Sequence, residues 1–488
     1  MSTRLPTRIA LFLTLLICNL AMAEEVAKPD AAKSDATVSY WNDIRPIFQV
    51  HCQGCHQPAK PGGEYVMTNF ESLKSGGETG DPAIIVGDPE ASLLMEYITP
   101  TDGAAMMPKD KPPLADADLE KIGLWIEQGA KDDTPDSARQ KYDQDNPPVY
   151  SAAPVLTAIQ FSPDGRYLAV GGYHEVLIHQ VERLLAGEPS LTARLIGMSE
   201  RIESVAFSPD GARLAVAGGS PGRLGEVQVW KIDDFSLDFS VPVTYDTIYG
   251  ISWSPDGKLI GFGCPDNTVR ALKAEDGEQV LFNGAHNDWV LDTVFSAKST
   301  YIVTVSRDRS MKLIEVGTER FIDNITSITP GALKGGLNGV DRHPTEDQLL
   351  IGGADGVPKI YRMFREKARK IGDDFNLIRK FPALPGRIFD VEFSKNAERI
   401  VAGSSFNGTG YVSVSNVGDG KLIAEMKGIP SAIFAVAFSA DGKWVASGGF
   451  SGDVFLHDAE TGELQRQFVP FTQGDKVVAD ASTSATDP

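Results

Sequence analysis

Phe161-Ser162-Pro163-Asp164-Gly165 is a short phrase that this chain of 488 residues repeats at regular intervals. Proline fixes φ and glycine accepts positive φ, so the phrase predicts a tight turn between two strands. An alternating apolar strand precedes each strong copy, and a strand rich in small and apolar residues follows it. Strong and weak copies begin, 42 to 51 residues apart, at Phe161, Phe207, Trp253, Phe295, Arg342, Phe393 and Phe438. Self-similarity at this period predicts a repeat architecture.

Seven units of this length resemble the WD-repeat family of β-propellers. The resemblance implies an all-β, seven-bladed propeller over residues 155–471, about two thirds of the chain. Trp230 stands at the position of the family's tryptophan, and His286, Ser306 and Asp308 match the side chains that brace a blade. His457-Asp458 replaces the usual Trp-Asp pair. These residues are therefore expected to be structural, since propellers carry many activities and the fold alone does not fix one. The last unit also contains an outer strand of its own, so the ring need not borrow a strand from its beginning.

Cys52-Gln53-Gly54-Cys55-His56 carries the clearest chemistry in the chain. Two cysteines three apart with histidine next are the attachment signature of a c-type haem. Cys52 and Cys55 can form thioethers to the haem vinyl groups, and His56 can bind the iron as the proximal ligand. A bare CxxC pair would also fit a zinc half-site, a disulfide or a redox pair. The adjoining histidine and the absence of a second cysteine pair favour one covalently bound haem c.

The first 23 residues indicate export. Arg4 and Arg8 precede a mostly apolar run, and Ala21-Met22-Ala23 is a cleavage site of the A-x-A type, as in a secretory signal peptide. Covalent haem attachment takes place outside the cytoplasm in bacteria, so we expect a periplasmic or otherwise extracytoplasmic protein. We expect a flexible leader (24–38), a helical domain (39–130), a linker (131–154) and, after the propeller, a disordered tail (472–488).

The helical domain is expected to be small and all-α. Ser39 can cap a first helix that places Trp41, Ile44, Ile47 and Phe48 on one face and ends at the cysteine motif. Asp88-Pro89 is expected to open a second helix. A third runs from Asp116 until Gly129 ends it.

The sixth iron ligand is expected to be a methionine. Met106-Met107-Pro108 lies before the last predicted helix, where c-type cytochromes carry theirs, and we expect Met107 to be the distal ligand, with Met106 second. Met95, on a helix, fits the domain core better, and Met67 is a further candidate. Thioether ligation raises the reduction potential.

This domain resembles the planctomycete-type cytochrome c family over about 90 residues. The matching stretches are Ile44-Arg45-Pro46-Ile47, the cysteine motif, Gly62-Gly63, Val86-Gly87-Asp88-Pro89, Met107-Pro108 and Trp125-Ile126-Glu127-Gln128-Gly129-Ala130. The family often shows Met-Pro-Pro, whereas Lys109 follows Pro108 here. Such domains are commonly fused to other modules, WD-type propellers included, so the resemblance implies electron transfer and does not specify a substrate.

Composition limits the partners. The net charge is −20, with 66 acidic and 46 basic residues. A surface this acidic repels nucleic acid and anionic lipid. No stretch after the signal is long and apolar enough to span a bilayer. The charge favours basic or neutral partners, and the haem motif implies one or more redox partner proteins.

Three functions fit these features. The first is an exported electron carrier that uses one haem, with the propeller as a docking platform for a partner or substrate. The second is a haem-dependent oxidoreductase whose active site lies in the propeller, although the repeats contain no cluster of carboxylates or nucleophiles. The third is a sensor or scaffold in which the haem reports redox state or a gas. The sequence leaves catalysis open and favours the electron carrier.

Overall fold

A computed structural model describes residues 37–57, 60–68, 70–135, 139, 142–326, 334–368, 370 and 374–471. The described residues from Val38 onward pack as one compact unit. The predicted signal peptide (1–23), all but the end of the leader, and the tail (472–488) lie outside the described residues.

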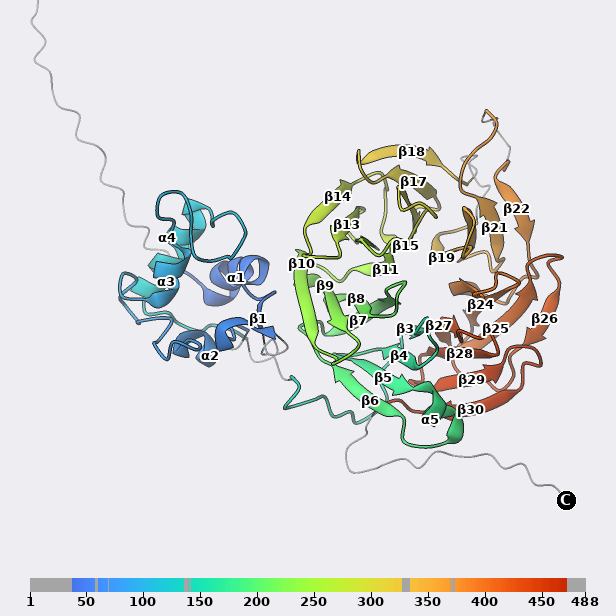
Figure 1. The fold of residues 1–488 in the computed structure, drawn as a ribbon, viewed down its shortest axis with the longest axis horizontal. Helices are drawn as coiled ribbons and strands as arrows, with labels where there is room; N and C mark the ends of the chain where they lie inside the picture. Colours follow the sequence, from blue (N-terminus) through green and yellow to red (C-terminus); the bar gives the residue numbers. More distant parts are fainter. Residues whose placement is uncertain are drawn as a thin grey trace, which may run out of the picture. The chain divides into compact units, whose positions relative to one another are not determined.

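The repeats form a ring of four-stranded antiparallel sheets (Figure 1). Seven such sheets are found in the described residues, and each is one continuous segment of chain. The first four blades are β3 (Ala158–Phe161), β4 (Tyr167–Gly171), β5 (Val176–Gln180) and β6 (Leu191–Leu195); β7 (Arg201–Phe207), β8 (Arg213–Ser220), β9 (Leu224–Lys231) and β10 (Leu237–Thr244); β11 (Tyr249–Trp253), β12 (Leu259–Gly263), β13 (Val269–Lys273) and β14 (Gln279–Asn283); and β15 (Val290–Phe295), β16 (Tyr301–Ser306), β17 (Met311–Glu315) and β18 (Arg320–Asn324). The last three are β19 (Leu337–Arg342), β20 (Gln348–Gly353), β21 (Lys359–Arg362) and β22 (Leu377–Lys380); β23 (Arg387–Phe393), β24 (Arg399–Phe406), β25 (Thr409–Asn416) and β26 (Leu422–Glu425); and β27 (Ile433–Phe438), β28 (Trp444–Gly449), β29 (Val454–Asp458) and β30 (Leu464–Phe468). A short helix, α5 (Val181–Ala186), lies between β5 and β6.

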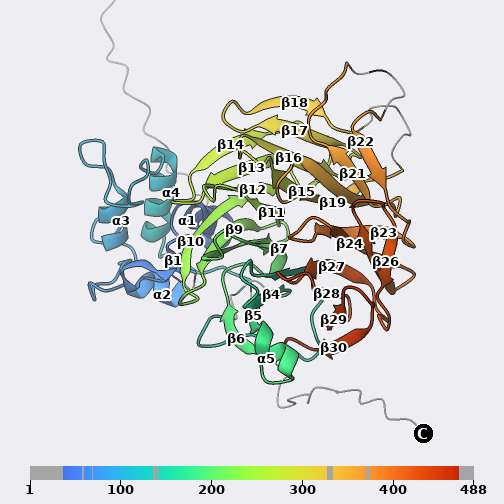
Figure 2. The same cartoon turned by 45° about the vertical axis from the view of Figure 1, so that its right-hand side comes forward.

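The inner strands surround the axis and hold the ring together. Each contacts the inner strand of the next blade, and β27 contacts β3, which closes the circle (Figure 1). Figure 2 shows the same ring of blades from a second direction. At the closure the amide of Leu156 donates to the carbonyl of Gly449 at 2.9 Å. Seven hydrophobic clusters each combine residues from two adjacent blades. Burial of apolar surface between blades therefore stabilises the ring, and the predicted seven-bladed propeller is confirmed.

The repeated phrase forms the turn between the first two strands of a blade. The amide of Gly165 donates to the carbonyl of Ser162 at 2.9 Å, and the Ser162 hydroxyl donates to Asp164 at 2.6 Å. Gly165 has φ +75°, a left-handed conformation that glycine adopts without cost. In two weaker copies Ser299 and Ala397 take this position with φ near +60°. The turn therefore has the same backbone conformation in these copies, although their sequences lack the glycine.

The N-terminal domain contains short helices and a small β ladder. The helical segments are η1 (Tyr40–Ile44), α1 (Arg45–His51), η2 (Gly62–Glu64), α2 (Phe70–Ser75), α3 (Leu93–Ile98) and α4 (Asp116–Glu127), and the ladder pairs β1 (His56–Gln57) with β2 (Lys60–Pro61). They enclose a separate hydrophobic cluster around Trp125, which is 1% exposed. Because of the ladder and the shortness of the helices, the predicted all-α class is not established for this domain.

Details of the helical prediction differ from the structure. Ser39 does cap the first helical segment, since its hydroxyl accepts the amide of Asn42 at 2.9 Å. Trp41 lies outside the core, half-buried, with the Arg45 guanidinium 4.2 Å from its ring centroid. The second helix starts at Leu93, because the Asp88 carboxylate accepts the Ala91 amide at 3.1 Å and forms a turn there instead.

Candidate functional site

The cysteine motif follows directly from α1. The amides of Cys52 and Gln53 both donate to the carbonyl of Phe48, and the amides of Cys55 and His56 donate to Cys52 at 3.1 Å. These bonds wind the motif into a turn. Both motif cysteines are free thiols, Cys52 half-buried and Cys55 exposed. Removal of water around Cys52, together with the nearby Cys55, raises the pKa of its thiol to about 12. Burial therefore favours the neutral form of the Cys52 thiol.

Two buried glutamines hold the motif loop in place. Gln53 is 3% exposed, and its side-chain amide donates to the carbonyl of Met67 at 2.9 Å. Gln57 is 1% exposed, and its side-chain amide donates to the carbonyl of Gln53 at 3.1 Å. Buried amides need such partners, so the loop has a fixed conformation.

His56 is oriented as a metal ligand requires. Its Nδ1 lies 3.3 Å from the carbonyl oxygen of Tyr65. A carbonyl only accepts hydrogen bonds, so Nδ1 carries the proton and Nε2 keeps its lone pair for a metal. Burial lowers the pKa of His56, although this hydrogen bond opposes the shift. The Tyr65 hydroxyl donates to the Leu73 carbonyl at 2.7 Å, which anchors the acceptor.

A cavity of about 500 Å³ opens beside the motif. This lies within the usual range for cofactor pockets, about 300–1,000 Å³. Glycines keep the backbone close around it: a Cβ on Gly77 would lie 2.3 Å from the carbonyl oxygen of Gly63, and one on Gly62 would lie 3.1 Å from that of Cys55. The apolar lining residues include Val50, Met67, Leu93, Leu94, Tyr97, Ile98, Met107 and Pro108. An apolar cradle with a histidine and two thiols at its wall fits a haem.

The four candidate methionines lie in different places. Met107 is half-buried and lines the cavity, with its amide donating to the carbonyl of Tyr97 at 2.9 Å. Met106 is 55% exposed and does not line the cavity. Met67 is 2% exposed and also lines it, but its amide donates to the carbonyl of His56, so it belongs to the proximal side. Met95 packs against the domain core. The geometry favours Met107, and its role as ligand stays a prediction.

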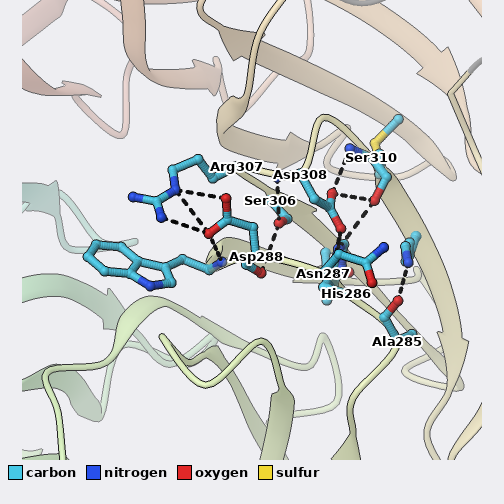
Figure 3. A network of polar contacts seen from close by, with 12 residues as sticks. Ala285, His286, Asn287, Asp288, Ser306, Arg307, Asp308 and Ser310 are labelled. Carbon is cyan, nitrogen blue, oxygen red and sulfur yellow. Dashed lines mark hydrogen bonds and ion pairs between the residues drawn. The ribbon is translucent and has the colours of Figure 1, made fainter. Parts of the chain in front are cut away.

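The predicted bracing residues meet in the fourth blade (Figure 3). His286 Nδ1 donates to Asp308 at 2.9 Å, and its Nε2 lies 2.6 Å from the Thr304 hydroxyl. Ser306 donates to the Asp288 carbonyl at 3.1 Å and accepts the Asp308 amide at 3.0 Å. Burial alone would raise the pKa of Asp308, but hydrogen bonds from His286, Ser310 and Asn287 outweigh it and lower the pKa. The network ties the entry loop of the blade to its central turn, which is a structural role.

In the second and seventh blades, buried polar side chains on the third strand also make hydrogen bonds. Trp230 is buried, and its indole N–H donates to Gln228 at 2.9 Å. His457 is buried, and its Nε2 donates to the carbonyl of Lys427 at 2.7 Å. In the part of the chain that the structure describes, no group of three or more His, Cys, Asp or Glu side chains is placed to hold a metal ion.

Family models match both parts of the chain. The model described as "Planctomycete cytochrome C" matches residues 52–111, which contain the cysteine motif and Met107. The chain is a fusion of a planctomycete cytochrome c domain with a WD propeller. Two propeller models match as well, "Anaphase-promoting complex subunit 4 WD40 domain" at residues 221–330 and "WD domain, G-beta repeat" at residues 420–458.

Similarity to individual proteins is confined to part of this fusion. The eukaryotic translation initiation factor 3 subunit I of Mycosarcoma maydis is 39% identical over 76 residues, which are 16% of this chain and 20% of that protein. The fusion thus spans about a fifth of the length of the curated relative it matches. Among solved structures, the computationally designed Ika8 protein is 20% identical with a TM-score of 0.48, over 67% of this chain and 90% of its own.

Two further findings concern the partners of the fusion. Among the described residues no helix is long and apolar enough to cross a membrane. A WD propeller indicates protein partners, whose identity is not specified by the residues of the ring.

The WD propeller has a central cavity of about 560 Å³, and half-buried carboxyl groups lie among the residues that line it. Each of three aspartates accepts a backbone amide from the next blade: Asp292 from Val340 at 2.8 Å, Asp341 from Phe393 at 2.7 Å and Asp390 from Val436 at 2.8 Å. An inner strand is the free edge of its sheet, and unpaired edge amides are costly when enclosed. These carboxylates therefore join the blades around the axis. No sequence motif predicted them, because each contact spans about 50 residues.

Stability is expected to depend on pH through these aspartates. Enclosure by the ring raises the pKa of Asp390 from 3.8 to about 7 and that of Asp341 to about 6. The folded chain therefore binds more protons than the unfolded chain between pH 3.8 and about 7, and this contribution to stability falls as the pH rises through that window.

Asp390→Asn should remove the part of this dependence that comes from Asp390. The difference in free energy of unfolding, variant minus wild type, is expected to rise between pH 4 and pH 8 in urea titrations. Asp233→Asn, at an exposed aspartate of the same propeller, is the control and should show no such rise. Parallel curves for wild type and Asp390→Asn would contradict the assignment.

Proposed function

We propose that this chain is an exported c-type cytochrome that transfers electrons through one covalently bound haem and uses the WD propeller as a docking platform. The observation that carries the proposal is the cavity beside Cys52, Cys55 and His56, in which a backbone carbonyl fixes the imidazole and leaves its Nε2 available. A bound haem iron would supply one-electron oxidation and reduction.

The residues of the cavity have distinct roles in this proposal. Cys52 and Cys55 hold the group covalently, and His56 binds on the proximal side. Tyr65 keeps the imidazole protonated at Nδ1 and so orients it. The apolar wall would exclude water, and Met107 would supply a second protein ligand to a bound haem iron. Two protein ligands would favour electron transfer over catalysis on an exogenous ligand.

Export is part of the proposal. The signal sequence at residues 1–23 supports it, together with the location of c-haem attachment outside the bacterial cytoplasm. The mature chain is expected to begin at Glu24, and N-terminal sequencing of the secreted protein tests this.

The test of the function is a visible spectrum of the full chain secreted from a host with c-haem maturation. We expect a reversible c-type spectrum with a methionine–iron band that carbon monoxide leaves unchanged. Met107→Ala should lose that band and bind carbon monoxide readily. Met106→Ala is the matched control and should keep the wild-type spectrum, because Met106 is exposed outside the cavity.

Other outcomes would decide against an electron carrier. A wild-type spectrum that shifts readily with carbon monoxide would mean an open iron position and would favour catalysis or gas sensing. A haem that cannot be reduced and reoxidised reversibly would reject electron transfer. If Met106→Ala lost the band and Met107→Ala kept it, Met106 would be the iron ligand instead of Met107.

A further inference from the structure

The outer strand of the second blade differs from the other outer strands of the propeller. β10 has eight residues, whereas β6, β14, β18, β22, β26 and β30 have four or five. A long strand with an unpaired edge is a liability in a soluble protein and is usually covered. In this chain the cytochrome domain covers it, since α1 and β2 both contact β10.

The contact reaches the cysteine motif itself. A Cβ on Gly54, between the two motif cysteines, would lie 2.4 Å from the carbonyl oxygen of Ser240 and 3.8 Å from Cδ of Pro242. Only glycine permits this approach without a shift of either backbone. Beside it, the Lys60 ammonium donates to the carbonyl of Asp238. The motif loop therefore packs directly on the strand.

Interactions inside the blade hold the strand rigid at this point. The Ser240 hydroxyl donates to the carboxylate of Glu226 at 2.5 Å, and Glu226 is fully buried. The same carboxylate accepts from the Ser199 hydroxyl at 2.7 Å and from the Gln228 amide at 2.6 Å. A buried carboxylate satisfied by three donors fixes the groups that surround it.

Ser240, Val241 and Pro242 also line the cavity beside Cys52, Cys55 and His56. We propose that β10 is a wall of the haem pocket, so that the WD propeller and the cytochrome domain form one redox unit. This inference rests on the proposed haem function. The strand closes the pocket on the side of the cysteine motif, excludes water there, and prevents a redox partner from approaching that edge. Partners must then use the part of the rim that is exposed, where Val50, Glu78, Thr79, Lys109 and Lys111 line the cavity.

The first test measures the reduction potential of the haem-loaded full chain. Pro242→Asp places a negative charge at the pocket wall and admits water, both of which stabilise the ferric state. We expect its potential to fall clearly below that of wild type. Ile322→Asp introduces the same charge on β18, the outer strand of the fourth blade, where Ile322 is 37% exposed, and should leave the potential unchanged. Equal reduction potentials for haem-loaded Pro242→Asp and Ile322→Asp would reject the proposal that β10 is a wall of the pocket. The proposed haem function would stand in that case.

The second test needs no haem. In the full chain produced without haem maturation, hydrogen exchange of residues 237–244 is compared between wild type and Gly54→Ala. The added methyl group should separate the loop from Ser240 and make these residues exchange faster. Gly123→Ala is the control in the same domain, since a Cβ there meets only Met95 Cε at 3.8 Å. Unchanged exchange in Gly54→Ala would overturn the contact. A full chain that acquires no haem in a maturing host would instead reject the proposed function, whatever the exchange shows.

Discussion

Replacing Cys52 and Cys55 together with alanine is expected to abolish covalent haem binding completely. Each thiol can add across one vinyl group, and without either sulfur no thioether forms. After secretion from a maturing host, a denaturing gel stained for haem should show a strong band for wild type and none for the double variant. With His56 alone, any haem would be bound non-covalently and would be lost when the protein is denatured.

Cys264→Ala is the matched control for this experiment. Cys264 is the other cysteine described by the structure, fully buried at the end of a propeller strand and far from the motif in sequence. Its variant should keep the full haem stain. A stain that persists in Cys52→Ala/Cys55→Ala would show that the motif is not the attachment site.

Trp125→Ala is expected to unfold the cytochrome domain and leave the WD propeller folded. Trp125 is 1% exposed and lies among Tyr40, Phe48 and Phe70, with its indole N–H donating to the carbonyl of Lys131 at 3.1 Å. Removal of a buried tryptophan costs about 3–5 kcal/mol. The hydrophobic cluster of this domain contains no propeller residue, so the loss should remain local.

Calorimetry of the full chain would check this result. The transition of the cytochrome domain should shift to low temperature or vanish, while the transition of the propeller remains. Trp41→Ala is the control, because Trp41 is half-buried and contacts Arg45 rather than the core. A joint loss of both transitions in Trp125→Ala would mean that the propeller depends on the cytochrome domain for folding.

Local signals made much of this architecture predictable. The turn phrase that begins at Phe161 is encoded within five residues, so repetition revealed seven blades. The cysteine motif is equally local, and Met107 lies in the loop before α4, where the family pattern placed it. Ser39 was recognisable as a helix cap for the same reason.

Long-range contacts escaped prediction because no sequence pattern records them. Gly54 and Ser240 are separated by more than 180 residues, and the packing of α1, β2 and the motif loop on β10 brings them together. In the sequence, the aspartates of the central cavity look like ordinary strand residues, because the amide that each one accepts belongs to the next blade. Helical spacing put Trp41 on one face with core residues such as Ile44, but its ring contacts the guanidinium of Arg45 instead.

Because every blade is one continuous segment, the propeller begins and ends at the same seam. Val155 and Phe471 both lie against Gly172, and the rings of Tyr150 and Phe471 are 5.0 Å apart. Among the described residues, no sheet contains strands from both ends of the propeller. Such a ring can be inserted into a longer polypeptide, or its ends can be relocated to any junction between blades, without breaking a strand pair. A cytochrome can be joined to it through a linker in the same way.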